Sequence, residues 1–266
     1  MKQYSLDADT RQAIAKQLYT AEEEHTPIPV LTARYPQITL DDAYDIQKTG
    51  LGLRLAAGAA VVGRKIGITS RGMMKQLQCD SPDYGYLLDK TLVLEGQSCL
   101  RSELNVPILE GELAFIIGED IQGLGLTTAH ILNAVSWVVP CFEVCDARYT
   151  SWKGVTVRDT ISDNAGASRF MLGSCPRRVN EVNLKCVGMV MERNGVFMDS
   201  AAGAEVMGSP LNSMLWLANK LAEYGDGLRK GDVVLSGAFM SAISCEQGDS
   251  FCLNVDGFPP LTIHFE

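Results

Sequence analysis

The chain has 266 residues, of which 46% are hydrophobic and 21% charged, so it is long enough for one large folded unit and too apolar to be disordered. Its formal net charge is -9 and no run of Lys or Arg exceeds two residues, which argues against a nucleic-acid-binding surface. No stretch has the ~18 consecutive apolar residues that a membrane-spanning helix needs.

The first residues, MKQYSLDADTRQ, contain no apolar segment of the kind found in secretion signals, so we expect a cytoplasmic protein. The eight cysteines are then expected to be reduced. Cys141 and Cys145 form a close pair, but no second Cys pair or His pair completes a zinc site, and we interpret both as core residues. The chain has no G-x-S-x-G motif to support a Ser-His-Asp site.

The first third of the chain has the pattern of helices. Asp9, followed by Gln12 three residues later, resembles a capping box that opens a helix reaching to about Glu24. The apolar face of this helix would contain Ile14, Leu18 and Ala21.

Two prolines then break the helical pattern. A second helix is predicted to begin near Thr39, with Asp42 three residues further on, and to end near Gly58. Residues 1–60 are therefore expected to form an N-terminal helical region.

Strand-like segments follow, at residues 61–69, 112–117, 137–144, 232–239 and 250–266. These strands do not alternate with helices, and the phosphate-binding fingerprints G-x-G-x-x-G and G-x-x-x-x-G-K-[ST] are absent. A dinucleotide-binding doubly wound sheet is therefore disfavoured. We expect an α+β fold in which residues 61–266 form a β-rich catalytic core and work as one functional unit with the N-terminal region.

Two further local signals lie near the end of the chain. Asn194-Gly195 stands between two β-rich runs and favours a type I′ hairpin, because both central residues of that turn need a positive φ. Ser209-Pro210 is typical of a helix start and Gly225 of its end. The apolar stripe of this helix is expected to comprise Leu211, Met214, Leu215, Ala218, Leu221 and Ala222.

Glu110 and Glu112 are the strongest local indication of chemistry. Residues i and i+2 of a strand point to the same face, so the two carboxylates would lie side by side with Gly111 opposite. Neighbouring carboxylates repel each other unless a cation or a proton lies between them. The pair therefore indicates either a site for a hard divalent cation or a solvated strand rim.

Glu143 favours the metal site, because it lies in the otherwise apolar run 137–144. A buried carboxylate costs several kcal/mol unless it is paired or bound to a metal. An ion pair with Arg148 or with another basic residue is the alternative. Three glutamates in β-rich segments make an all-oxygen site plausible, and such sites bind Mg²⁺ or Mn²⁺ in preference to zinc.

Lys65 would share one strand face with Gly63 and Gly67, which leaves room for a ligand above its ammonium group. It could bind a substrate carboxylate, transfer a proton or form a Schiff base, or it could be an ordinary lysine of an edge strand. Asp83 lies in a segment, 79–85, that reads as a turn or loop, where it could be a general base or only a turn former.

Two other polar pairs are weaker candidates for substrate binding. Asp163 and Asn164 read as a turn that could also be a polar pocket wall. Ser236 and Gly237, at the end of a predicted strand, offer a hydroxyl and a backbone N–H group.

Six short motifs occur in one order along the chain. They are Gly63-Arg-Lys-Ile-Gly-Ile-Thr-Ser70, Ser81-Pro-Asp-Tyr-Gly85, Glu110-Gly-Glu-Leu-Ala-Phe115, Val139-Pro-Cys-Phe-Glu143, Ile161-Ser-Asp-Asn-Ala165 and Leu215-Trp-Leu-Ala-Asn-Lys-Leu221. Together they resemble the 2-oxopent-4-enoate hydratase / 4-oxalocrotonate decarboxylase group of the fumarylacetoacetate hydrolase superfamily. The resemblance runs from about Tyr35 to the last residue.

The resemblance implies a mixed β-roll core and a Mg²⁺ or Mn²⁺ ion held by Glu110, Glu112 and Glu143. It places the active-site lysine and aspartate of the family on Lys65 and Asp83. Members act on small 2-oxo acids in bacterial meta-cleavage of aromatic compounds. They are commonly homo-oligomers, and related hydratases and decarboxylases associate with each other.

Two reactions compete within this group. A hydratase adds water to a 2-hydroxy-2,4-dienoate and gives a 4-hydroxy-2-oxo acid, whereas a decarboxylase removes CO₂ from 4-oxalocrotonate. The decarboxylases carry an apolar residue at the position of Asp83, so the aspartate favours a hydratase. Gly166 and Ser209 depart from the family pattern, which leaves open whether the diene carries a second carboxylate. A non-catalytic supporting subunit is the third alternative.

Overall fold

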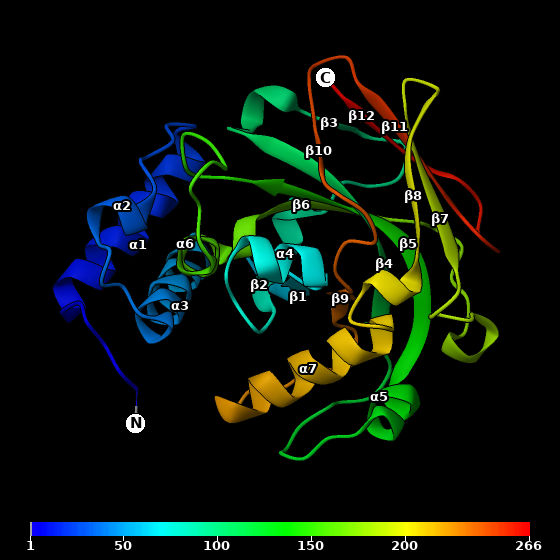
Figure 1. The fold of residues 1–266 in the computed structure, drawn as a ribbon, viewed down its shortest axis with the longest axis horizontal. Coiled ribbons are helices and arrows are strands. Elements are labelled where there is room, and N and C mark those ends of the chain that lie inside the picture. The colour runs from blue at the N-terminus through cyan, green and yellow to red at the C-terminus, as the bar shows by residue number, and fades with distance from the viewer. Residues whose placement is uncertain (1) are drawn as a thin grey trace.

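The computed structural model describes residues 2–266, and Figure 1 shows N-terminal helices beside two curved sheets. The helices are α1 (Ala8–Glu23), α2 (Leu31–Arg34), α3 (Leu40–Ala56), α4 (Arg71–Gln76), α5 (Thr128–Ala134), α6 (Val157–Ser162) and α7 (Pro210–Glu223). The strands are β1 (Val61–Gly67), β2 (Asp83–Leu88), β3 (Ser98–Cys99), β4 (Pro107–Ile117), β5 (Val135–Asp146), β6 (Ala167–Leu172), β7 (Gly188–Arg193), β8 (Val196–Ala202), β9 (Val233–Leu235), β10 (Ile243–Ser244), β11 (Ser250–Val255) and β12 (Leu261–Phe265).

The two long N-terminal helices follow the predicted pattern except at the first cap. The N-cap of α1 is Asp7, whose carboxylate accepts a hydrogen bond from Thr10 N, so the prediction of Asp9 as the cap was wrong by two residues. Asp9 instead lies in the first turn, where an acidic side chain favours the helix dipole. The capping box of Thr39 and Asp42 at the start of α3 is confirmed.

The N-terminal helices do not have a core of their own. Their buried residues, such as Leu18 and Ile46, form one cluster with Ala147, Tyr149 and Val155, which follow β5. Polar contacts reinforce this packing, since Asp159 Oδ1 of α6 accepts from the Thr32 N–H of α2 at 2.9 Å. The helical region and the β-rich region therefore meet where β5 leads into α6.

The first sheet has the strand order β2-β1-β9-β4-β5-β6, with β10 paired to β4. β1 and β9 run parallel, whereas the other pairs are antiparallel, so the sheet is mixed as expected. Its two longest strands, β4 and β5, curve strongly through the middle of the molecule (Figure 1). β4 begins at Pro107, five residues before the predicted strand, so Glu110 lies within it.

The second sheet, β3-β12-β11-β7-β8, packs against the face of β4 opposite the glutamates. A Cβ atom on Gly111 would lie only 2.7 Å from Leu253 Cδ1 of β11, so a side chain at position 111 would push the sheets apart. The β7–β8 hairpin has the predicted turn, with φ of 54° at Asn194 and 75° at Gly195. β8 forms one edge of this sheet and leaves Val196 and Phe197 exposed.

Helix α7 borders the first sheet near β1 and α5 (Figure 1). It begins after its N-cap Ser209 with Pro210, as predicted. Its buried side was predicted only in part, because Leu217 is buried whereas Leu211, Leu215 and Ala222 are half-buried. No helix among residues 2–266 is both long enough and apolar enough to span a membrane.

Candidate functional site

A pocket of about 970 Å³ lies between the first sheet, α4 and the segment that leads into α6. Lys65 and Asp83 reach it from β1 and β2, and Glu110 and Cys145 reach it from β4 and β5. Residues 152–158 and 76–80 line much of the remaining wall. Four of the residues that could carry chemistry are therefore brought to one cavity from segments far apart in the sequence.

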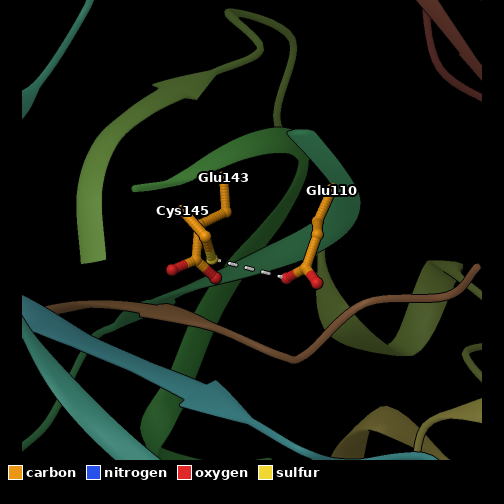
Figure 2. Close-up of side chains that lie close together, drawn as sticks. All are labelled: Glu110, Glu143 and Cys145. Carbon is orange, nitrogen blue, oxygen red and sulfur yellow. Dashed lines mark hydrogen bonds between the residues drawn. The ribbon is translucent and has the colours of Figure 1, made fainter. Parts of the chain in front are cut away.

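The antiparallel pairing of β4 and β5 builds the carboxylate cluster. Glu110 is directly opposite Glu143, so both side chains lie on the same face of the sheet. Figure 2 shows Glu110, Glu143 and Cys145 extending from the two strands into the same space. Ligand atoms of these three residues all lie within 4.8 Å of one another.

Glu112 lies on the same face but has a different partner. Its Oε2 accepts a hydrogen bond of 2.7 Å from Gly237 N, and its Oε1 is buried with no hydrogen-bond partner among the described residues. The group with ligand atoms within 4.8 Å contains Cys145 in place of Glu112. The expected trio of glutamates is thus present on one face, with the Glu112 carboxylate held at one side by the backbone.

Lys65 is the cation of this cluster. Its Nζ lies 3.1 Å from Glu143 Oε1 and 3.8 Å from Cys145 Sγ, which in turn lies 3.8 Å from Glu110 Oε2. Burial by itself would lower the pKa of Lys65, but the neighbouring Cys145, Glu143 and Asp83 raise it well above its ordinary value. These neighbours therefore favour the charged form of the ammonium group.

One ammonium group does not balance the acidic groups around it. Burial, together with the charge of Glu143, raises the pKa of Glu110 to about 7 and raises that of Glu112 well above its ordinary value. Glu112 Oε1 and Glu143 Oε2 are both buried without a hydrogen-bond partner among residues 2–266. Buried carboxylate oxygens without hydrogen-bond partners are donors of the kind that fits a hard divalent cation.

Asp83 and Lys65 meet across β1 and β2. Lys65 pairs with Gly85 and Gly67 with Asp83, so the lysine and the aspartate are diagonal neighbours. Asp83 is the first residue of β2, so the prediction of a loop over residues 79–85 was wrong for its last part, where pairing with β1 extends the chain.

The Asp83 carboxylate is buried and has one free oxygen. Its Oδ2 accepts a hydrogen bond of 2.7 Å from Thr160 Oγ1, whereas Oδ1 has no hydrogen-bond partner in the described part of the chain. Burial raises the pKa of Asp83, and the charge of Lys65 offsets part of this effect. Asp83 thus holds a proton more readily than an exposed aspartate does.

Asp163 and Asn164 do not line the pocket. The carboxylate of Asp163 bonds to the buried Arg148, accepting from its backbone N at 3.0 Å and from its Nε at 2.5 Å. The side chain of Asn164 bonds to the backbone of Tyr86, accepting from N and donating to O. The geometry gives both residues a structural role, and the neighbouring Ala165 lines the pocket in their place. Arg148 thus pairs with Asp163, whereas the basic partner of Glu143 is Lys65, so an ion pair of Glu143 with a base other than Arg148 is present in the structure.

Ser236 and Gly237 lie behind the cluster. The Ser236 hydroxyl is fully buried and bonds to backbone groups, lying 3.3 Å from Leu113 N and 3.1 Å from Gly237 O. The Gly237 N–H, which we expected to be free for a ligand, fixes Glu112. Gly237 has a φ of 100°, and a Cβ atom there would lie 2.3 Å from Thr69 Oγ1.

Two residues of the site were not singled out from the sequence. Cys145 was interpreted as a core residue, although alternation along β5 places it on the same face as Glu143. That alternation was a signal available in the sequence. Thr160 lies 77 residues from Asp83, and no local pattern connects the two.

Comparisons with known proteins agree with this geometry. Residues 69–266 match the family described as "Fumarylacetoacetate (FAA) hydrolase C-terminal". The chain is 41% identical over 213 residues to a 2-hydroxypent-2,4-dienoate hydratase of Pseudomonas putida, covering 80% of this chain and 96% of that one. It is 35% identical to a 2-oxo-hept-4-ene-1,7-dioate hydratase of Escherichia coli, covering 97% and 99%.

A solved structure is also similar over nearly the whole chain. It is the 4-oxalocrotonate decarboxylase from Pseudomonas putida G7, complexed with magnesium and adipate. The two structures superpose with a TM-score of 0.96 at 32% identity, covering 99% of this chain and 100% of that one.

Proposed function

The chain belongs to the fumarylacetoacetate hydrolase family, and from this premise we propose that it is a hydro-lyase that adds water to a 2-hydroxy-2,4-dienoate. The product is a 4-hydroxy-2-oxo acid, formed in the meta-cleavage catabolism of aromatic compounds. The substrate is a small 2-oxo acid of the 2-oxopent-4-enoate or 2-oxohept-4-ene-1,7-dioate type, as the names of the similar hydratases indicate.

The observation that carries this proposal is the position of Asp83. Asp83 lines the same cavity as Glu110 beside Lys65, its Oδ1 has no hydrogen-bond partner among the described residues, and its raised pKa lets the carboxyl group hold a proton more readily than an exposed aspartate does. Hydration needs such a group, because one proton must reach the carbon chain and another must leave the attacking water.

The order of proton movements follows from the chemistry of the dienol. Loss of the enol proton and protonation of the terminal diene carbon give a conjugated 2-oxo acid. Water then adds its hydroxyl to the carbon β to the new carbonyl, and a proton is added to the α carbon. We assign these transfers to Asp83, while the ammonium group of Lys65 pairs with negative charge on the substrate.

Glu110, Glu112 and Glu143 are the residues that would hold Mg²⁺ or Mn²⁺. When bound, the ion supplies Lewis-acid stabilisation of negative charge on the 2-oxo oxygen. Gly237 N fixes the orientation of Glu112 from behind. The 32%-identical decarboxylase, whose solved complex contains magnesium, supports this assignment.

A 4-oxalocrotonate-type decarboxylase is the second candidate, because the structure that superposes with a TM-score of 0.96 has that activity. Both reactions build up negative charge on a 2-oxo acid and would use the same carboxylate cluster. Hydration also requires proton delivery to the carbon chain, and Asp83 therefore favours the hydratase.

An assay with Mg²⁺ distinguishes the two reactions. The purified protein is offered 2-hydroxypenta-2,4-dienoate, its heptadienedioate analogue and 4-oxalocrotonate in turn. We expect loss of the diene absorbance without release of CO₂, and we expect EDTA to abolish it. Release of CO₂ from 4-oxalocrotonate as the faster reaction would contradict the hydratase assignment.

A non-catalytic supporting subunit is the least favoured alternative. If the protein were such a subunit, Glu112→Gln would change neither metal binding nor turnover, since both would already be absent. Loss of a measurable activity in this variant would exclude that role.

Two further properties belong to this proposal. A homo-oligomer, with association to a paired enzyme of the same pathway, is supported by the edge strand β8 with its exposed Val196 and Phe197. A cytoplasmic location is supported by the eight cysteines, which are all free in the structure, as expected in a reducing compartment.

A further inference from the structure

Cys145 gives the carboxylate cluster a ligand of a different chemical kind. Its sulfur lies 3.8 Å from Glu110 Oε2, and it shares with Glu110 and Glu143 a region in which all three ligand atoms are within 4.8 Å. The ligand atoms around a tetrahedral zinc ion are separated by about 3.3–3.8 Å, so small side-chain movements would let all three bind one ion.

The cluster also has an unsatisfied acceptor and a route to solvent. Glu143 is 1% exposed and its Oε2 has no hydrogen-bond partner among the described residues. Cys145 is buried but lines the pocket, so an ion can reach its sulfur from the cavity.

Lys65 marks where positive charge is stabilised. Its ammonium group lies 3.1 Å from Glu143 and 3.8 Å from the Cys145 sulfur, so it is already the counter-ion of this group. A divalent ion would replace it and contact the same atoms with twice the charge.

We propose that Glu110, Glu143 and Cys145 form a binding site for thiophilic divalent ions such as Cd²⁺, Zn²⁺ and Co²⁺, at the position where Mg²⁺ or Mn²⁺ supports turnover. On binding, the thiol proton is released to solvent and a metal–sulfur bond forms, with no change in oxidation state. This inference rests on the proposed function in so far as Glu110 and Glu143 are assigned there as metal ligands.

The Cys145 sulfur should make the site bind thiophilic ions more tightly than Mg²⁺ or Mn²⁺. Thiolate is a soft ligand that binds Zn²⁺ and Cd²⁺ strongly, whereas Mg²⁺ and Mn²⁺ prefer oxygen and gain little from it. The affinity of nitrogen, oxygen and sulfur sites also rises from Mn²⁺ through Co²⁺ to later ions. Thiophilic ions should therefore displace Mn²⁺ and inhibit the enzyme.

Titration with Cd²⁺ and with Co²⁺ tests the proposal without relying on turnover. We expect a thiolate-to-metal charge-transfer band on addition of one equivalent, together with one-for-one release of bound Mn²⁺. In Cys145→Ser this band should disappear and Cd²⁺ affinity should fall by about 100-fold, whereas Mn²⁺ affinity should change by less than about threefold. A band of unchanged intensity in Cys145→Ser would overturn the proposal.

Cys79→Ser is the matched control, because Cys79 lines the same pocket outside the cluster. This variant should keep the band, whereas Glu110→Gln and Glu143→Gln should weaken it. If Cys145→Ser does not fold, Cys145→Ala takes its place, and circular dichroism checks that the alanine variant is folded.

A Cd²⁺ band that appears without release of Mn²⁺ would refute a shared site. Absence of Mg²⁺-dependent turnover with the band intact would reject the proposed function alone.

Discussion

At the scale of single residues, the proton transfers of the proposed function depend on Asp83. We expect Asp83→Asn to lower kcat for hydration by about 10²- to 10⁴-fold, because an amide cannot exchange the proton that the carboxyl group transfers. Mn²⁺ affinity, measured by calorimetry, should be unchanged, since Asp83 is outside the set of proposed ligands. Hydration at wild-type rate in this variant would remove Asp83 from the mechanism.

A substitution at Thr160 tests the role of Asp83 without removing its carboxyl group. Its hydroxyl donates a hydrogen bond to Asp83 Oδ2 and so stabilises the charged form of the carboxyl group. Thr160→Val should therefore raise the pKa of Asp83 further and move one limb of the pH–rate profile to higher pH, with Mn²⁺ affinity retained. A profile that does not move would show that Thr160 has no part in setting this pKa.

The raised pKa of Glu110, about 7, predicts that metal binding depends on pH. Burial and the charge of Glu143 keep the carboxyl group protonated below that value, and the proton must leave before an ion can bind. Mn²⁺ affinity should therefore rise with pH, by about tenfold per pH unit below about pH 7 for each proton released.

Calorimetry in two buffers of different ionisation enthalpy would count the protons released on Mn²⁺ binding. Glu110→Gln is the control, because it should lose this part of the pH dependence together with part of the affinity. An affinity that is constant from about pH 6 to pH 8 would contradict the assignment of Glu110 as a ligand.

At the scale of elements, the close pairing of β1 with β2 fixes the acid–base groups. A Cβ atom on Gly67 would lie 2.3 Å from Asp83 Oδ1 and 3.3 Å from Lys65 Nζ, so Gly67→Ala must displace the aspartate. We expect kcat to fall on the order of 100-fold, since a misplacement of about 1 Å has this effect. Wild-type turnover in this variant would mean that the position of Asp83 is not critical.

Gly188→Ala provides the matched control for this strand glycine. Gly188 begins β7, and a Cβ atom there would have no neighbour within 4 Å. Its turnover and its circular dichroism spectrum should match the wild type, which would separate the local displacement of Asp83 from a general effect of alanine in a strand.

Elements also mark how far the sequence could predict this site. Glu110 and Glu112 follow from the two-residue repeat of a strand, and Glu143 from the cost of a charge in an apolar run. Cys145 could have been found by the same repeat. Thr160 could not, and the Gly237 N–H was named as a ligand-binding group but not as the partner of Glu112, because these contacts depend on how α6 and the residues after β9 pack against strands far away in the sequence.

The boundaries of helices and strands could be predicted where they depend on nearby residues and could not where they depend on pairing with a distant strand. Thr39 and Asp42 were predicted as a capping box because that motif is complete within four residues. The extended start of β2 was missed, because a strand that begins at Asp83, directly after Ser-Pro, depends on the pairing of Asp83 with Gly67. The likeness of six ordered motifs to a known family predicted the mixed sheet where periodicity alone could not.

At the scale of the whole molecule, Asp159 joins the helical region to the rest of the chain. Its buried carboxylate accepts from the N–H of Thr156, the N-cap of α6, at 2.8 Å and from Thr32 N of α2 at 2.9 Å. Asp159→Ala should lower the free energy of unfolding by about 2–4 kcal/mol, because it removes a cap and leaves buried donors without a partner.

Urea denaturation followed by fluorescence would measure this loss. Asp7→Ala is the control, since Asp7 also caps a helix but is exposed and makes no contact between regions. Asp7→Ala should lower the free energy of unfolding much less than Asp159→Ala does. If the two variants were equally stable, residues 1–60 would contribute little to the stability of residues 61–266.

Asp83, the proposed proton-transfer group, and the glutamates of the carboxylate cluster occupy separate strand pairs, β1–β2 and β4–β5, with β9 between them. A change at Asp83 therefore leaves the pairing of Glu110 with Glu143 intact. If Asp83 carries the proposed proton transfers, this separation means that a substitution there alters one chemical step and leaves the strand pairing beneath the proposed ion site unchanged.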